Sequence, residues 1–277
     1  MSILGTYLWQ NFLTDSKVRH WIYDTTQQLY TASWATSLVE IGPGKGAITK
    51  LIKDISPDFT VIEKDQTMLT GLQELLGWNG QIVLRDVLES SIVSEKERPF
   101  VVGNLPYYIT SPILRKFFAT PVSSKKKSSD EQIFPVVGGL FMIQKEVGEK
   151  IASDAKKKSY LYWLLNYAYE VDYLKTVPPK AFTPPPKVYS CLISLKKKQK
   201  AELPQISFSD LITFLDLVAP YPRKTLGAIM TLLKKQHVHD TTLPAWMQSL
   251  QCEELAKKRL EELNREELSS LSPSATL

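Results

Sequence analysis

The sequence predicts an α/β fold, in which helices cover both faces of a mostly parallel sheet, followed by a smaller all-helical domain. Up to residue 199, short apolar runs alternate with amphipathic segments, which is the pattern of parallel strands joined by helices. After a charged and proline-containing stretch at residues 196–204, every apolar segment has helical spacing. We therefore expect two domains, residues 1–199 and residues 200–277.

The predicted elements follow one another in a regular order. Strands are predicted at residues 37–41, 59–62, 81–84, 100–103 and 139–143, and helices at residues 16–30, 47–55, 66–76, 112–118 and 144–151. Two further strands, at residues 161–169 and 188–195, are expected to form an antiparallel hairpin at the end of the sheet. The second domain is predicted to contain helices at residues 208–218, 225–235, 244–250 and 253–263.

Composition limits the class of protein. The chain has 277 residues, of which 43% are hydrophobic and 23% charged, and these values exclude a disordered chain. No apolar run approaches the roughly 18 residues of a membrane helix, and the first ten residues do not resemble a signal peptide. Two distant cysteines and three histidines provide neither a disulfide framework nor a metal site. We expect a cytoplasmic protein that binds no metal and no membrane.

A glycine-rich segment, Gly42–Gly46, follows the first strand and precedes a helix. Glycines at such a turn allow the backbone to approach a ligand closely, so Gly42 and Gly44 are candidate cofactor-binding residues. A tight turn without a ligand also needs glycine. With Ala47, the segment satisfies the dinucleotide-binding pattern, so an oxidoreductase that uses a nicotinamide or a flavin remains an alternative at this point.

Polar residues stand at the ends of the next three predicted strands. Glu63 lies 21 residues after Gly42, the spacing at which a carboxylate accepts hydrogen bonds from ribose hydroxyls. Asp86 and Asn104 end the third and fourth strands, and Asp86 could accept a hydrogen bond from an adenine amino group. Because ligands of open parallel sheets bind beyond the carboxyl ends of the strands, we expect these side chains to surround one crevice.

The segment Asn104-Leu105-Pro106-Tyr107 distinguishes between the candidate chemistries. The exocyclic amine of adenine is a poor nucleophile, because its lone pair is delocalised into the ring. The Asn104 amide oxygen and the Leu105 carbonyl could accept its two protons, while Pro106 fixes the backbone and Tyr107 stacks on the extruded base. Such a site needs no metal and no strong base, since orientation and placed dipoles supply the catalysis.

Lysines are concentrated in blocks, at residues 125–127, 156–158 and 196–198, and the net charge is +5. One block is usually a solvated loop, whereas three favour a polyanionic partner.

Taken together, these segments resemble the ribosomal RNA adenine N6-dimethyltransferases, and most of all the branch that modifies small-subunit RNA. The matching segments are Gln10–Leu13, Val39–Gly46, Val61–Asp65, Asn104–Pro112, Met142–Val147, Ala181–Val188 and Arg223–Leu226. The resemblance implies a Rossmann-like class I methyltransferase fold with a seven-stranded sheet and S-adenosyl-L-methionine as cofactor. The implied reaction is N6,N6-dimethylation of adjacent adenosines in a 3′-terminal hairpin of small-subunit rRNA. The implied partner is the assembling small ribosomal subunit, on which the protein acts as a monomer.

The resemblance also implies roles for individual residues. Asn11 and Leu13 would close over the cofactor, Asn104 would serve both cofactor and target, and Phe182 would sandwich the target adenine opposite Tyr107. The residues implied to contact RNA are Lys156, Lys157, Lys158, Arg223 and Lys224. The family usually begins with a basic tail, which is missing here, and our hypothesis is that the lysine blocks compensate.

Two alternatives exist within this resemblance. The erythromycin-resistance branch methylates a large-subunit adenine and has a similar glycine segment and Asn-Ile-Pro-Tyr motif. Leu105, Tyr108 and Pro112 favour the small-subunit branch instead. A non-catalytic assembly or transcription factor on the same fold is the other alternative, and the intact Asn104–Tyr107 segment argues against it.

Overall fold

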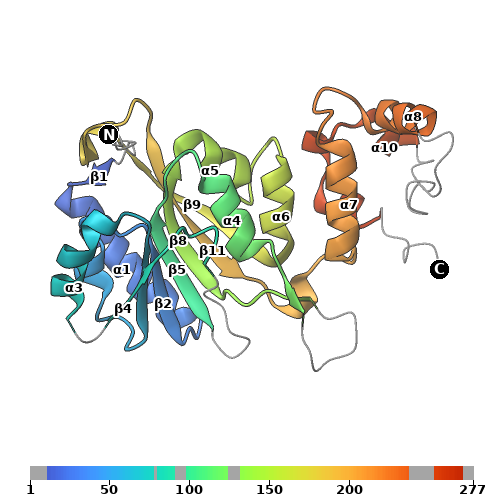
Figure 1. Cartoon of the computed structure of the whole chain (residues 1–277). Coiled ribbons are helices and arrows are strands. Elements are labelled where there is room, and N and C mark those ends of the chain that lie inside the picture. Colours follow the sequence, from blue (N-terminus) through green and yellow to red (C-terminus); the bar gives the residue numbers. More distant parts are fainter. Residues whose placement is uncertain (1–10, 78–79, 91–97, 124–131, 237–252, 271–277) are drawn as a thin grey trace, which may run out of the picture. The chain divides into compact units, whose positions relative to one another are not determined.

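The computed structural model describes residues 11–77, 80–90, 98–123, 132–236 and 253–270. The chain forms two compact units, shown in Figure 1. Unit 1 comprises Met1–Gly148 and Val171–Lys197, and unit 2 comprises Glu149–Glu170 and Lys198–Leu277. The last change of unit lies close to the end of the first predicted domain. The grouping of residues 149–170 with the C-terminal part of the chain is a feature that composition does not reveal.

Unit 1 is built around a seven-stranded sheet. Its strands, in spatial order, are β4 (Gly80–Leu84), β3 (Phe59–Glu63), β2 (Ser37–Ile41), β5 (Pro99–Asn104), β8 (Gly138–Gln144), β11 (Ser190–Lys197) and β9 (Tyr169–Val177). The pairs among β4, β3, β2, β5 and β8 are parallel, and β11 is antiparallel to β8. The mostly parallel sheet is therefore confirmed. The chain order reverses between β2 and β5, and a ligand crevice is expected at such a switch point.

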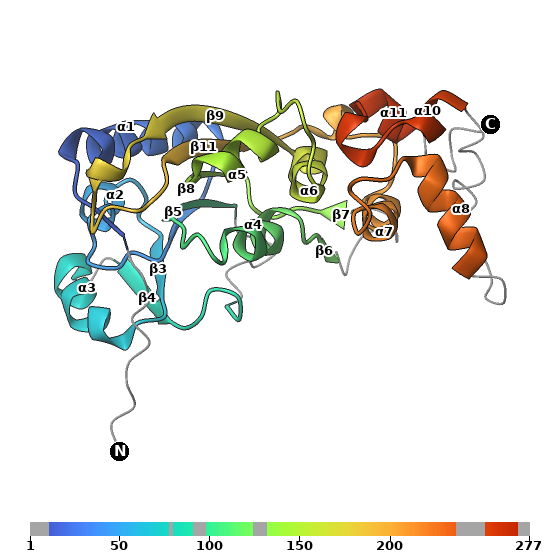
Figure 2. The ribbon, with the colours of Figure 1, turned by 90° about the horizontal axis from the view of Figure 1, so that it is seen from above.

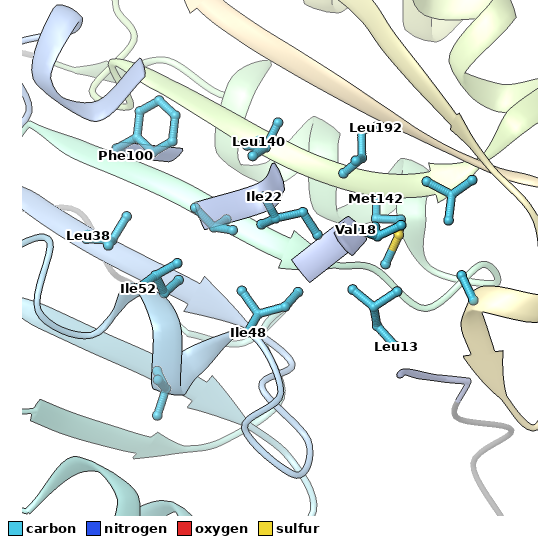
Figure 3. Close-up of a cluster of buried hydrophobic side chains, with 14 of the residues drawn as sticks. Leu13, Val18, Ile22, Leu38, Ile48, Ile52, Phe100, Leu140, Met142 and Leu192 are labelled. Atoms are coloured by element: carbon cyan, nitrogen blue, oxygen red, sulfur yellow. The ribbon is translucent and has the colours of Figure 1, made fainter. Parts of the chain in front are cut away.

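Helices cover both faces of this sheet, as Figure 2 shows. The helices of this part are α1 (Ser16–Ala32), α2 (Thr49–Ile52), α3 (Leu69–Leu76) and α4 (Thr110–Phe118), and α5 (Lys145–Ile151) begins in unit 1 and ends in unit 2. Val18 and Ile22 of α1 pack with Leu140 and Met142 of β8 in the buried cluster drawn in Figure 3. On the opposite face, the Phe118 ring of α4 meets Phe141 edge to face at 5.5 Å. Alternation along β8 thus places α1 and α4 on different faces.

The N-terminus of α1 is fixed by local hydrogen bonds. Asp15 caps the helix by accepting a hydrogen bond from the Val18 N–H at 3.0 Å. Just before it, β1 (Phe12–Leu13) pairs with β10 (Phe182–Thr183) in a two-stranded antiparallel sheet. The segment that leads into α1 is therefore anchored beside the main sheet.

Two predictions for elements of the first domain were wrong. The segment 161–169, predicted as a strand, forms helix α6 (Tyr160–Ala168), and strand β9 begins only at Tyr169. Seven consecutive residues of α6 are buried, so its sequence lacks the polar positions that would reveal a helical period. The predicted helix 47–55 is shortened to α2, because the glycine turn extends further into it.

Unit 2 is helical. Besides α6 it contains α7 (Phe208–Val218), α8 (Leu226–Gln236), α10 (Glu253–Lys257) and α11 (Arg265–Ser269). The Tyr167 ring of α6 lies 5.0 Å from the Phe208 ring of α7, and its hydroxyl donates to the Ile206 carbonyl. The predicted helix 253–263 is divided into α10 and a 3-10 turn, whereas the predicted helix 244–250 lies outside the described residues. No helix in the described ranges is long and apolar enough to cross a membrane.

Candidate active site

A cavity of about 430 Å³ opens at the carboxyl ends of β2, β3, β4 and β5, within unit 1. Its volume lies in the range of small-molecule sites. The structure brings together in its wall ten of the residues that the sequence predicted for this site: Asn11, Leu13, Gly42, Gly44, Glu63, Asp86, Asn104, Leu105, Pro106 and Tyr107. Within the described residues there is no group of three or more His, Cys, Asp or Glu side chains arranged to hold a metal.

Glu63 holds the glycine segment in place. Its Oε2 accepts a hydrogen bond from the Gly44 N–H at 3.0 Å, and its Oε1 accepts from the N–H groups of Lys64 and Asp65 at 2.8 and 2.9 Å. Gly44 has φ +54°, and a Cβ at this position would lie 3.2 Å from the Phe12 ring. The carboxylate expected to bind ribose is therefore oriented by the same backbone that forms the turn.

Asp86 is also held by two groups. Its Oδ2 accepts from the Lys64 ammonium at 2.7 Å, and its Oδ1 accepts from the Leu88 N–H at 2.9 Å. The hydrogen bond from Lys64, followed by that from Leu88, lowers the pKa of the Asp86 carboxyl below its ordinary value. Lys64 lines the cavity, and we did not predict it. The available signal was its position after Glu63, at the end of the strand beside β4.

The Asn104–Tyr107 segment forms a turn whose backbone is fixed from both sides. The Leu105 N–H donates to the Met142 carbonyl at 3.0 Å, and the Pro106 carbonyl accepts from the Ile109 N–H at 3.1 Å. The Asn104 Nδ2 donates to the Asn11 carbonyl at 3.2 Å. This hydrogen bond holds the amide group of Asn104 in place. Its Oδ1 is the atom that can accept a hydrogen bond from a substrate amine.

Glu40 is a second residue of the cavity wall that we did not predict. It is 2% exposed, and burial raises its pKa to about 8, an effect that the Thr49 hydroxyl opposes and the Glu63 charge reinforces. Among the described residues, neither Glu40 Oε2 nor Thr49 Oγ1 has a hydrogen-bond partner of good geometry. Glu40 lies inside an apolar strand, where sequence alone does not separate a buried carboxyl from a surface one.

The structure does not bring Phe182 to the cavity. Its side chain is 3% exposed, belongs to the hydrophobic cluster of unit 1 and does not line the cavity wall. In the β1–β10 pair Phe182 stands opposite Leu13, which does line the wall. Its stacking on a target base remains a prediction.

The basic residues predicted to contact RNA belong to unit 2. Lys156, Lys157, Arg223 and Lys224 are exposed, and Lys158 is partly buried. Both loops dock on the segment 258–261: the Lys158 N–H donates to the Glu261 carbonyl, and the Leu226 N–H donates to the Lys258 carbonyl. The two groups of basic residues are therefore neighbours on unit 2.

Comparison with known proteins agrees with this geometry. The family model described as ribosomal RNA adenine dimethylase matches residues 5–272. The chain is 34% identical over 222 residues, 76% of its length and 70% of the relative's, to ribosomal RNA small subunit methyltransferase A of Bacillus thuringiensis. It is 30% identical over 256 residues, 87% and 80% of the two lengths, to the protein of the same name from Staphylococcus haemolyticus.

Solved structures show the same fold. A dimethyladenosine transferase from Plasmodium falciparum aligns with a TM-score of 0.69 and 20% identity, covering 94% of this chain and 95% of that one. The 23S rRNA methyltransferase ErmE aligns with a TM-score of 0.65 and 22% identity, covering 94% and 98%. At these identities the alignments establish the fold alone.

Proposed function

Because the chain belongs to the ribosomal RNA adenine dimethylase family, we propose that it transfers methyl groups from S-adenosyl-L-methionine to adenine N6 in small-subunit rRNA. The product is N6,N6-dimethyladenosine at adjacent adenosines of a 3′-terminal hairpin. One observation carries the proposal: the Asn104–Tyr107 turn lies in the wall of the cavity that Glu63 and Asp86 also line. One cavity thus contains both the carboxylates suited to a nucleoside and the turn suited to orienting an amine.

The residues of the cavity fit the cofactor. Glu63 and Asp86 provide carboxylates for ribose hydroxyls and for an adenine amine. Gly42, whose φ is +65°, leaves open space where a Cβ would stand, and Asn11 and Leu13 line the same cavity. When bound, S-adenosylmethionine supplies a methyl group on a positively charged sulfur, which is the electrophile of the reaction.

The chain's own residues prepare the adenine for attack. Asn104 Oδ1 and the Leu105 carbonyl accept hydrogen bonds from the N6–H groups, which favours a pyramidal nitrogen whose lone pair is available. After this lone pair has taken the methyl group, the sulfur leaves as the neutral thioether and the nitrogen releases a proton to solvent. Tyr107 presents an aromatic face to the extruded base. The backbone of the turn is held before substrate arrives, so little reorganisation is needed at the moment of transfer.

We assign RNA binding to the basic residues of unit 2. Lys156–Lys158, Arg223 and Lys224 lie in neighbouring loops that phosphates of a folded RNA can reach together. We further propose that the protein acts as a monomer in the cytoplasm, on the assembling small subunit. In this scheme residues 1–199 supply catalysis and residues 200–277 contribute to binding, with the loop 156–158 joining the second group.

The proposed function is tested by methyl transfer from labelled S-adenosylmethionine to unmethylated small subunits, with naked large-subunit rRNA as the parallel substrate. We expect label in small-subunit RNA, recovered as N6,N6-dimethyladenosine. Label confined to large-subunit RNA would assign the protein to the resistance type. Tight cofactor binding without transfer to either substrate would indicate a non-catalytic assembly factor.

Replacing Lys156, Lys157 and Lys158 with serine is expected to weaken RNA binding and reduce its salt dependence. Each phosphate contact that is lost lowers the slope of log K against log salt concentration by about 0.7 to 0.9, so the full effect is a decrease of about 2 to 3. The measurement is a series of RNA-binding titrations at increasing salt.

A matched control replaces Lys17, Lys50 and Lys53, which lie on or beside α1 and α2 of unit 1, and it removes the same charge. An unchanged slope in the Lys156–Lys158 variant, or an equal decrease in the control, would contradict a specific role for this loop.

A further inference from the structure

The Tyr107 side chain is held at its outer end by a residue from a distant part of the chain. Its hydroxyl lies 2.7 Å from Ser190 Oγ, a hydrogen-bond distance across 83 residues of sequence. Ser190 is the first residue of β11, is fully buried, and stands opposite Gln144 in the antiparallel β8–β11 pair. The partner of Tyr107 is thus part of the rigid sheet.

This contact completes the restraint of the ring. The backbone on either side of Tyr107 is fixed by hydrogen bonds that the Leu105 N–H donates to the Met142 carbonyl and the Ile109 N–H donates to the Pro106 carbonyl. A tyrosine side chain has two rotatable torsions, and anchoring the hydroxyl to the sheet restricts χ1. The hydroxyl oxygen lies on the axis of χ2, so its position does not change when the ring turns about that axis. The long axis of the ring that lines the cavity is therefore held between the backbone of the turn and the sheet.

The hydrogen bond between Tyr107 and Ser190 joins two uncharged hydroxyl groups. Burial raises the pKa of the Tyr107 hydroxyl, although its hydrogen bond with Ser190 opposes the shift, so the phenol keeps its proton at neutral pH. A fully buried serine hydroxyl needs a partner, and removing either partner leaves the other poorly satisfied. Strand β11 pairs with β8 through backbone hydrogen bonds, so the sheet does not need the Ser190 hydroxyl in order to form.

We propose that Ser190 is a positioning residue that fixes the long axis of the Tyr107 ring, so that the ring stands at one place in the cavity wall when it receives the flipped target adenine. The proposal rests on the proposed function, because it takes the ligand of the ring to be a purine extruded from RNA. Ser190 does not line the cavity and acts through Tyr107 alone.

The test compares Ser190→Ala, Tyr107→Phe and the double variant. Ser194→Ala is the control, because Ser194 is a buried serine on the same strand, four residues away. We expect kcat for methyl transfer to fall about 5- to 10-fold in each single variant, the effect of losing one hydrogen bond. The double variant should lose no more than either single one, since both remove the same interaction.

A spectroscopic measurement separates positioning from general loosening. An RNA hairpin with 2-aminopurine at the target position reports stacking of the flipped base by a change in fluorescence. The wild-type change should be reduced alike in Ser190→Ala and Tyr107→Phe and kept in Ser194→Ala, with cofactor binding unaltered in all.

Methyl transfer by the wild-type protein in the same assay tests the proposed function separately from the role of Ser190. Wild-type kcat and fluorescence in Tyr107→Phe, which leaves no cavity in the sheet, would overturn the inference even if Ser190→Ala failed to fold. Additive losses in the double variant would overturn it as well.

Discussion

Replacement of Asn104 by alanine is expected to reduce methyl transfer by about 10²- to 10³-fold or more, while the protein remains folded. The substitution removes the amide oxygen that accepts a hydrogen bond from the N6 amine, and removing one such preorganised group has this order of effect. The measurement is single-turnover transfer at saturating cofactor, so that any weakening of cofactor binding does not enter the rate.

Two accompanying measurements make this result decisive. Circular dichroism and thermal unfolding should show that the fold persists, because Asn104 is only partly buried and its side chain donates a single hydrogen bond of 3.2 Å to the Asn11 carbonyl. Asn104→Asp provides a second variant of nearly the same shape, which keeps acceptor oxygens but cannot donate to the Asn11 carbonyl. Wild-type turnover in Asn104→Ala would refute the proposed chemistry.

Replacement of Glu40 by glutamine is expected to remove a large decrease in the free energy of unfolding that the wild type undergoes as pH rises. In the folded protein the pKa of Glu40 is about 8, whereas the carboxyl of the unfolded chain titrates near 4.5. Between these values the folded state binds more protons than the unfolded state, so the free energy of unfolding falls as pH rises through the window. The contribution is on the order of 5 kcal/mol when complete.

The measurement is urea unfolding of the wild type and Glu40→Gln between pH 5 and 9. The free energy of unfolding of the wild type relative to the variant should decline up to about pH 8 and then level off, because both states are ionised above the folded pKa. Glu74→Gln, at an exposed position of α3, is the control and should follow the wild type. Parallel curves for wild type and Glu40→Gln would contradict the buried, protonated carboxyl.

The strand ends of the sheet could be predicted because their signals are local. A short apolar run that stops at a glycine or a polar residue marks a strand end, and the parallel arrangement brings these ends to one edge. This reasoning placed Gly42, Glu63, Asp86 and Asn104 around one crevice, and the structure brings all four to the cavity wall. The family and the α/β fold that these residues predicted are confirmed by the family match and by the solved structures.

The contacts between side chains of distant segments could not be predicted. Lys64 meets Asp86 across two strands, and Tyr107 meets Ser190 across 83 residues, and neither pairing leaves a periodic trace in the sequence. Helix α6 was mistaken for a strand because it is buried all round, which removes the polar face that reveals a helix. The assignment of Phe182 to the target base remains a prediction.

The division of the chain into units has a consequence for how the protein is synthesised. During synthesis, Tyr167 of α6 is added about 40 residues before Phe208 of α7, the residue whose ring it contacts. Until then the Tyr167 ring lacks its contact with Phe208, and its hydroxyl lacks the Ile206 carbonyl to which it donates. An isolated fragment that ends near residue 199 lacks both contacts and leaves the apolar surface around Tyr167 uncovered, which favours aggregation.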